Sequence, residues 1–208
     1  MCPRPADPAI KNGLVRAATE LFLRNGFAAT SIDEICKSAG VTKGALFHHF
    51  KDKQALAHEV LCAWSAGGMA AYAGAPFHAE PDPMARVLGY VDFTIAISEH
   101  GPVGCLIGSL AQETSATHPR LRARCAGALA DWGTNLATLL EDARRSGKGD
   151  FDSESVAKHF VVVFEGAQLM AKAQKSTAVV KEELGHFRRY LCQLLGIDDR
   201  STRKRRKK

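Results

Sequence analysis

The chain has 208 residues, of which 46% are hydrophobic and 24% charged, a composition typical of a folded globular protein rather than a disordered one. No apolar run reaches the roughly 18 residues that a membrane-spanning helix needs, and the first residues do not resemble a signal peptide. We therefore expect a cytoplasmic protein with no membrane partner.

The net charge of +6 is unevenly distributed. Residues 200–208 carry seven basic side chains and no acidic one, whereas residues 61–199 hold more acidic than basic groups. Residues 1–60 are slightly basic and include His48, His49 and His58. Positive charge at both ends of the chain favours a polyanionic partner such as nucleic acid.

The cysteines are too scattered for a metal site or a disulfide framework. The six lie at positions 2, 36, 62, 105, 125 and 192, with no C-x-x-C pair and no zinc-finger spacing. We expect reduced thiols, most of them in the core, with no bound metal and no cofactor.

Helical periodicity dominates in chain order, and no segment alternates as a strand would. The first predicted helix ends at Gly26, and Ser31-Ile-Asp-Glu34 forms a capping box for the second. Further start and stop signals place the remaining helices at about 43–50, 52–72, 84–100, 105–114, 119–147, 153–175 and 178–195. The fold class is therefore all-α, with about nine helices.

We expect three regions along the chain. Residues 1–53 form a short helical head, and residues 54–199 form a longer helical body. Residues 200–208 form a basic tail without helical register, which we expect to be disordered. The tail either adds non-specific attraction to DNA or only aids solubility.

Residues 31–50 have the pattern of a helix-turn-helix: a capped helix of two turns, a glycine turn and a second short helix. Such a unit places its second helix in the major groove of DNA. The segment Thr30-Ser-Ile-Asp-Glu-Ile-Cys-Lys-Ser-Ala-Gly-Val-Thr-Lys-Gly-Ala-Leu-Phe-His-His-Phe-Lys-Asp-Lys53 resembles the DNA-binding head of the tetracycline-repressor (TetR) family. The resemblance extends over about 55 contiguous residues and includes Asn25-Gly26-Phe27. It implies that residues 1–53 are a helix-turn-helix DNA-binding domain and that residues 54–199 are a domain for effector binding and dimerisation.

The resemblance implies a role for each residue of this segment. It assigns phosphate contacts to Thr30, Lys43, His49 and Lys53, and it makes Thr42 the cap of the recognition helix. It lets the backbone at Gly44 approach the DNA closely, and it directs Ala45 and His48 at base edges. Phe47 stands where the family usually has tyrosine, so the phosphate hydrogen bond from that hydroxyl is lost.

The resemblance also implies a homodimer, because family members usually pair their last two long helices into a four-helix bundle. The predicted helix at 153–175 supports this expectation, because it is apolar nearly all round. One side carries Phe160, Val163, Phe164, Ala167 and Met170, and much of the other carries Val161, Val162 and Leu169. A helix that is apolar on two sides is buried on both.

Gly104-Cys105-Leu106 followed by Leu110-Ala111-Gln112-Glu113 is similar to a signature of one TetR subgroup, which includes repressors that answer small electrophiles and unsaturated acids. The similarity makes Cys105 and Glu113 candidate sensor residues. The helix start at Cys105 favours a thiolate there. The alternative is that Cys105 packs as a buried thiol and that Glu113 caps or pairs locally.

Four more residues complete the candidate effector site. Glu165, Gln168 and Lys172 share one face of a helix, where they form either the polar wall of an effector cavity or a solvated rim. We add Trp132 from the preceding helix.

The function that we expect is a repressor responsive to a ligand or an electrophile, which binds a palindromic operator in double-stranded DNA as a dimer. A second possibility is an architectural, weakly specific DNA-binding protein. An all-α enzyme using Cys105, His159 and Glu165 has no supporting nucleophile–base motif, so we do not expect an enzyme.

Overall fold

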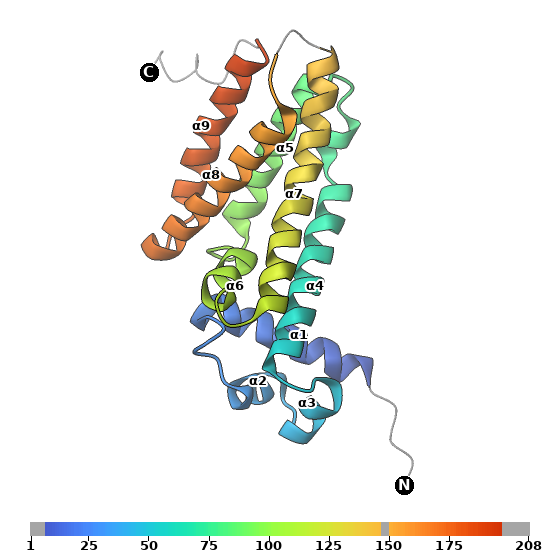
Figure 1. The fold of residues 1–208 in the computed structure, drawn as a ribbon, viewed down its shortest axis with the longest axis vertical. Helices are drawn as coiled ribbons and strands as arrows, with labels where there is room; N and C mark the ends of the chain where they lie inside the picture. Colours follow the sequence, from blue (N-terminus) through green and yellow to red (C-terminus); the bar gives the residue numbers. More distant parts are fainter. Residues whose placement is uncertain (1–6, 147–149, 197–208) are drawn as a thin grey trace. The chain divides into compact units, whose positions relative to one another are not determined.

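The computed structural model describes residues 7–146 and 150–196, and every regular element in these two ranges is a helix (Figure 1). They are α1 (Pro8–Asn25), α2 (Ile32–Ala39), α3 (Lys43–His49), α4 (Lys53–Ala73), the 3-10 helix η1 (Pro76–Ala79), α5 (Pro83–His100), α6 (Leu106–Thr114), α7 (Pro119–Ser146), α8 (Ser153–Gln174) and α9 (Ala178–Leu194). The all-α prediction is confirmed.

The predicted start and stop signals act as expected in the first helices. The Ser31 hydroxyl accepts a hydrogen bond from the Glu34 amide at 3.2 Å, and the Glu34 carboxylate accepts one from the Ser31 amide at 2.7 Å, which completes the capping box of α2. Gly40 ends α2 in the left-handed conformation, with φ of 67°. Within residues 7–146 and 150–196, the one element that the periodicity did not predict is η1, which lies in the proline-containing break before α5.

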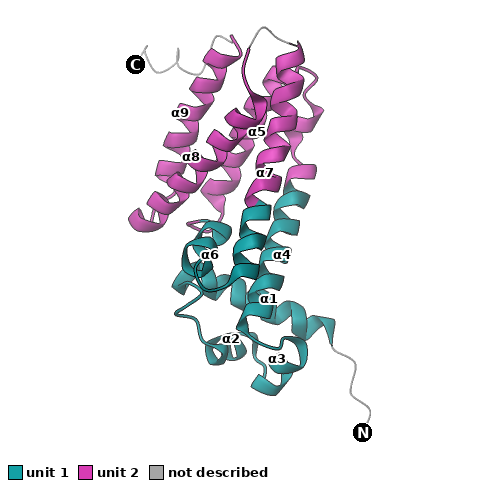
Figure 2. Ribbon diagram, in the orientation of Figure 1, with its two compact units in different colours: residues 1–71, 105–128 teal, residues 72–104, 129–208 magenta. Residues whose placement is uncertain are grey.

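The chain divides into two compact units (Figure 2), each with its own core. Unit 1 comprises residues 1–71 and 105–128, so α6 and the start of α7 belong to the same unit as α1, α2 and α3. Its core contains Leu14, Phe22, Ile35, Leu46, Phe50, Leu56, Leu110 and Leu121, all nearly inaccessible to solvent. The compact unit that contains the helix-turn-helix therefore extends beyond residue 53. The expected boundary at residue 53 between a DNA-binding domain and an effector-binding domain stays a prediction.

Unit 2 comprises residues 72–104 and 129–208, and its core is rich in aromatic rings. Tyr90 of α5, Trp132 of α7 and Phe160 of α8 lie in edge-to-face contact, with ring centroids 5.4 Å apart in the Tyr90–Phe160 and Trp132–Phe160 pairs. Two ion pairs between α5 and α9 reinforce the packing, Asp92 with Arg188 at 2.9 Å and Glu99 with Lys181 at 2.8 Å.

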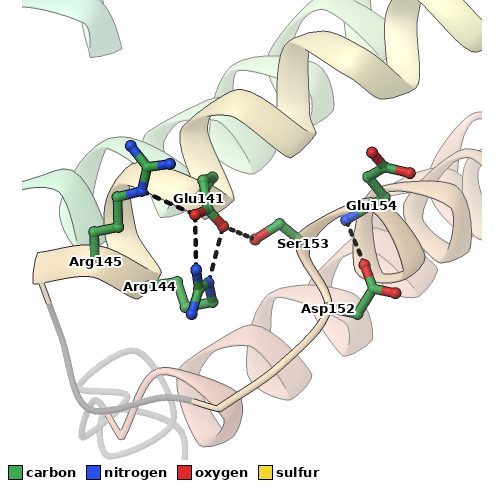
Figure 3. A network of polar contacts seen from close by, with 6 residues as sticks. All are labelled: Glu141, Arg144, Arg145, Asp152, Ser153 and Glu154. Carbon is green, nitrogen blue, oxygen red and sulfur yellow. Dashed lines mark hydrogen bonds and ion pairs between the residues drawn. The ribbon is translucent and has the colours of Figure 1, made fainter.

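A polar network joins the end of α7 to the start of α8 (Figure 3). The carboxylate of Glu141 accepts two hydrogen bonds from Arg144, at 2.8 and 2.9 Å, one from Arg145 at 2.9 Å and one from Ser153 at 3.0 Å. The Arg144 hydrogen bond contributes most to lowering the pKa of Glu141, which falls to about 2. Asp152 caps α8 by accepting from the amides of Glu154 and Ser155.

The tail at 200–208 and Cys2 lie outside the described residues. Among the residues that are described, no helix is long and apolar enough to cross a membrane. No group of three or more His, Cys, Asp or Glu side chains in these ranges could hold a metal ion.

Candidate DNA-binding and effector sites

The core of unit 1 holds α3 in place through two buried side chains. Leu46 and Phe50 are 0% and 4% exposed and belong to the same apolar cluster as Ile35 of α2 and Phe22 of α1. Thr42 caps α3, because its hydroxyl accepts a hydrogen bond from the Ala45 amide at 3.2 Å. The inward face of α3 is thus fixed, and its other face is free to contact a partner.

The outward face of α3 consists of the residues to which the sequence assigned DNA contacts. Thr42, Lys43, Gly44, Phe47 and His48 are exposed, and Ala45 and His49 are half-buried. The rings of His48 and His49 meet edge to face at 5.5 Å. Phe47 is 50% exposed, which is unusual for a phenylalanine on a small folded unit.

Nothing within the fold requires glycine at position 44. A Cβ placed there would meet no atom closer than the Thr42 hydroxyl oxygen, at 3.8 Å, and the residue lies in an ordinary helix. Glycine weakens a helix relative to alanine by roughly 0.5–1 kcal/mol. A close approach from outside the chain would account for this glycine, in agreement with the expected contact to the DNA backbone.

Lys43 is exposed and lies at the start of α3, where it forms an ion pair with Asp33 at 2.8 Å. Both side chains are more than half accessible to solvent, so water screens this pair strongly. A phosphate group can therefore compete with Asp33 for the Lys43 ammonium at little cost.

Thr30 and Lys53 are engaged within the protein instead of pointing outward. Thr30 is 1% exposed, and its hydroxyl donates to the carbonyl of Gly26 at 2.7 Å. The Lys53 ammonium donates to the carbonyls of Phe27 and Thr30 at 2.8 and 2.9 Å and lies over the Phe27 ring. These placements favour a structural role in the α1–α2 loop over the expected side-chain contacts with phosphate.

Glu113, a candidate sensor residue, contacts the same loop from α6. Its carboxylate accepts a hydrogen bond from the Ala28 amide at 2.7 Å and lies against Gly26. This is the local pairing that the sequence left open as an alternative to an effector contact.

In unit 2, Trp132 packs against the core and Gln168 lies within it. Trp132 stands edge to face against Phe164 at 4.5 Å, and Gln168, one turn further along α8, is 5% exposed. No donor in the described chain reaches the buried Oε1 of Gln168. An unpartnered polar atom in a core is costly, so this oxygen is an available hydrogen-bond acceptor.

Tyr90 belongs with these two residues, although sequence reasoning did not select it. Its hydroxyl is buried without a well-formed hydrogen bond, and burial raises its pKa far above the usual range. The indole of Trp132 lies near enough to oppose that shift slightly. The only signal in the sequence is its helical register with Val87 and Val91, which marks a core position and says nothing about its hydroxyl.

The remaining effector candidates are half-buried. Glu165 and Lys172 lie on α8, and the aliphatic part of Lys172 packs on Gly104, where a Cβ would lie 3.4 Å from the Lys172 Cδ. Cys105 is the N-cap residue of α6. Cys36, Cys125 and Cys192 are buried, and burial raises the pKa of the first two thiols.

A stripe of exposed residues runs along α8 on the side away from its buried face. Its members recur at helical spacing and are apolar or small: Val162, Gly166, Leu169, Met170 and Ala173. Val162 is 69% exposed and Leu169 53%. The opposite side carries Phe160 and Phe164 in the core, so α8 is apolar on both sides, as its sequence predicted. Met170, which we expected on the side of Phe160, is 48% exposed and belongs to the stripe instead.

The capped α2, the glycine turn and the exposed face of α3 define a helix-turn-helix regulator of transcription. Comparison with known proteins agrees: residues 14–60 match the model of bacterial regulatory proteins of the tetR family, and residues 83–187 match the tetracyclin repressor-like C-terminal domain. The chain belongs to the TetR family.

Three similar proteins illustrate the relationship. The transcriptional regulator AcuR of Cereibacter sphaeroides is 30% identical over 83% of this chain and 81% of its own. The crystal structure of regulatory protein TetR from Rhodobacter sphaeroides superposes with a TM-score of 0.76 at 28% identity, covering 86% of this chain and 96% of its own. The crystal structure of E. coli NemR in its reduced form superposes with a TM-score of 0.74 at 25% sequence identity. The match covers 86% of this chain and 94% of the NemR chain.

The family and these relatives are transcriptional regulators, so this protein is a regulator of transcription and not an enzyme.

Proposed function

We propose that the protein is a cytoplasmic repressor that binds a palindromic operator as a homodimer and is released by a small effector. The observation that carries the proposal is the outward face of α3, whose residues are exposed or half-buried, while Leu46 and Phe50 fix the inward face in the core of unit 1. Membership of the TetR family supports the general mode of action.

In this proposal α3 reads the major groove. The imidazole of His48 donates to an acceptor such as guanine N7, and the methyl group of Ala45 contacts a thymine methyl. Lys43 exchanges Asp33 for a phosphate, and His49 contacts a second phosphate. The start of α2 is held in place by Thr30 and Lys53, whose bonds within the loop position the backbone for the DNA.

The apolar stripe on α8 supports the dimer. A helix of a partner copy laid on Val162, Leu169 and Met170 would remove these side chains from water, which favours association by about 25 cal/mol per Å² of apolar surface. Gly166 presents no Cβ in the middle of the stripe and lets the partner's helix approach closely.

The effector site of the proposal lies in the core of unit 2, around Tyr90, Trp132 and Gln168. Aromatic rings would form its walls, and the Oε1 of Gln168 would accept a hydrogen bond from the effector. Glu165 and Lys172 extend the same face of α8. A small, largely apolar molecule with one donor group fits this chemistry.

Cys105 is proposed as a second, covalent route of release. Its thiolate would add to the β-carbon of an α,β-unsaturated carbonyl compound, and the α-carbon would then take a proton from solvent. The support is its half-buried position as the N-cap residue of α6, where backbone amides and the helix dipole favour a thiolate.

Two substitutions on α3 test the reading of DNA. Lys43→Ala should lower affinity for all sequences alike and reduce the slope of log affinity against log salt by about one unit. His48→Ala should relax the preference at one base position, at a cost of about 1–3 kcal/mol. If both substitutions weakened operator and random DNA equally, the assignment of a base contact to His48 would be wrong.

Mass spectrometry after treatment with N-ethylmaleimide tests the covalent route. Cys105 should be modified first, the treated protein should leave the operator, and Cys105→Ser should block release without weakening operator binding. Cys62 is the informative competitor, because it is also half-buried and its sulfur lies 3.7 Å from the His58 imidazole. If Cys62 were modified before Cys105, the covalent route through Cys105 would be wrong and Cys105 would have only a packing role.

A further inference from the structure

The loop between α1 and α2 is held by two side chains of opposite charge that come from different helices. Lys53, at the start of α4, donates to the carbonyls of Phe27 and Thr30 at 2.8 and 2.9 Å. Glu113, near the end of α6, accepts from the amide of Ala28 at 2.7 Å. We call these two side chains the loop clamp; the cation holds carbonyls and the anion holds an amide of the same turn.

The loop is shaped to admit the Glu113 carboxylate. Gly26 has φ of 87°, and a Cβ on it would lie 2.7 Å from the nearer carboxylate oxygen, so no other residue fits beside Glu113 without displacement. The adjacent Phe27 is buried, with its ring edge to face against Phe22 and against His118. Glu113 and Ala28 are both exposed, so the close fit of the carboxylate against Gly26, and not burial, distinguishes this contact.

The clamp acts on the start of the helix-turn-helix. Thr30 is buried and bonded to Gly26, and Ser31, the next residue, is the N-cap of α2. Because α2 and α3 share a core cluster, a shift of residues 26–30 would move the first helix of the motif and, through it, the recognition helix.

We propose that Glu113 is a positioning residue for operator binding: through its carboxylate, α6 holds the α1–α2 loop in the conformation that presents α2 and α3 to DNA. The proposal rests on the proposed function, since it concerns affinity for an operator. It assigns to α6 a role in the DNA-binding head that its place in the sequence, beginning 57 residues after the last residue of α3, does not suggest.

If Glu113 acted only through its charge, removing it should strengthen DNA binding, whereas the loop clamp predicts weaker binding. Loss of an acidic group from a DNA-binding unit reduces repulsion of the phosphates, so a carboxylate without a positioning role would give tighter binding when replaced. The clamp predicts weaker binding to the operator. The sign of the change therefore separates the two accounts.

The test uses the full-length protein and a fluorescent duplex of the DNA upstream of its own gene that the wild type protects in footprinting. Glu113→Ala should lower operator affinity about tenfold, because a hydrogen bond to a charged acceptor is lost. Affinity for a random duplex should stay equal or rise. Glu113→Gln keeps an acceptor oxygen and should restore part of the operator affinity.

Gln112→Ala is the matched control, since Gln112 is the exposed neighbour on the same turn of α6 and makes none of the described loop contacts. It should bind as the wild type does. Hydrogen exchange adds a readout at the loop itself: the peptide that contains Ala28 should exchange faster in Glu113→Ala and not in Gln112→Ala.

Equal or tighter operator binding by Glu113→Ala, with the wild type protecting its DNA, would overturn the inference and leave the proposed function intact. A parallel loss of operator and random-DNA affinity would also overturn it, because that pattern indicates general destabilisation. Failure of the wild type to protect any upstream DNA would overturn the proposed function itself.

Discussion

At Gly44, one substitution should change the stability of the protein and its affinity for DNA in opposite directions. The fold has room for a Cβ at this position, so Gly44→Ala should raise the free energy of unfolding by about 0.5 kcal/mol. The same methyl group would meet the DNA backbone and should lower operator affinity about tenfold, the order of cost that overpacking brings. Denaturant unfolding and operator titration of one variant measure both effects, and a variant that gained stability without losing affinity would contradict the assigned contact.

At Phe47, adding one hydroxyl group should increase operator affinity. Its ring is half exposed on the outward face of α3, where the family usually has a tyrosine. Phe47→Tyr should raise operator affinity several-fold, because the added hydroxyl can donate to a phosphate and a net hydrogen bond is worth about 1 kcal/mol. Filter binding or anisotropy at fixed salt measures the gain. Unchanged affinity would mean that Phe47 does not face a phosphate.

At the scale of the element, α8 should determine the oligomeric state. Leu169→Glu places a charge in the middle of the exposed stripe and should convert the dimer to a monomer, with loss of the paired operator contacts. Ile97→Glu is the matched control, because Ile97 is exposed to a similar extent, 47% against 53%, but lies on α5. Light scattering measures the molecular mass of each variant in solution. If the Leu169→Glu variant stayed a dimer, as the Ile97→Glu variant should, the proposed interface would be wrong.

The polar network between α7 and α8 should make the stability of the folded protein decrease at acidic pH. The pKa of Glu141 is lowered from 4.5 to about 2, chiefly by its hydrogen bonds with Arg144. A group whose pKa is lower in the folded state stabilises the protein above its unfolded value and loses that contribution as pH falls through the folded value.

Glu141→Gln should therefore be modestly less stable than the wild type at pH 7, and the two proteins should converge as pH falls from about 4.5 towards 2. Thermal unfolding across this pH range measures the difference. A constant difference at every pH would show that the carboxylate charge has no part in the junction.

For the whole molecule, most of the fold could be predicted from the sequence because its helices carry local signals. The capping box at Ser31–Glu34, the glycine at position 40 and the proline breaks act within a few residues of one another. The outward residues of α3 are assigned from the resemblance to the TetR family, which rests on one contiguous segment of the chain. These features depend on neighbours in sequence, so periodicity and spacing reveal them.

The contacts of Glu113 and Lys53 could not be predicted, because they join residues far apart in the chain. The Glu113 carboxylate meets an amide 85 positions earlier, and Lys53 meets a carbonyl 26 positions earlier. The unpartnered hydroxyl of Tyr90 was missed for a similar reason, since register with Val87 and Val91 marks it as a core residue only. Non-local polar contacts leave no periodic trace in a sequence.

The central claim is that the molecule is an operator-specific dimeric regulator, and footprinting on the DNA upstream of its gene tests it most directly. The account predicts protection of one or two short palindromic segments, with half-sites in successive major grooves about 10 base pairs apart or a multiple of that spacing. His48→Ala should alter the same base position in both half-sites. Uniform protection along the DNA, or protection of a single unrepeated half-site, would contradict the claim.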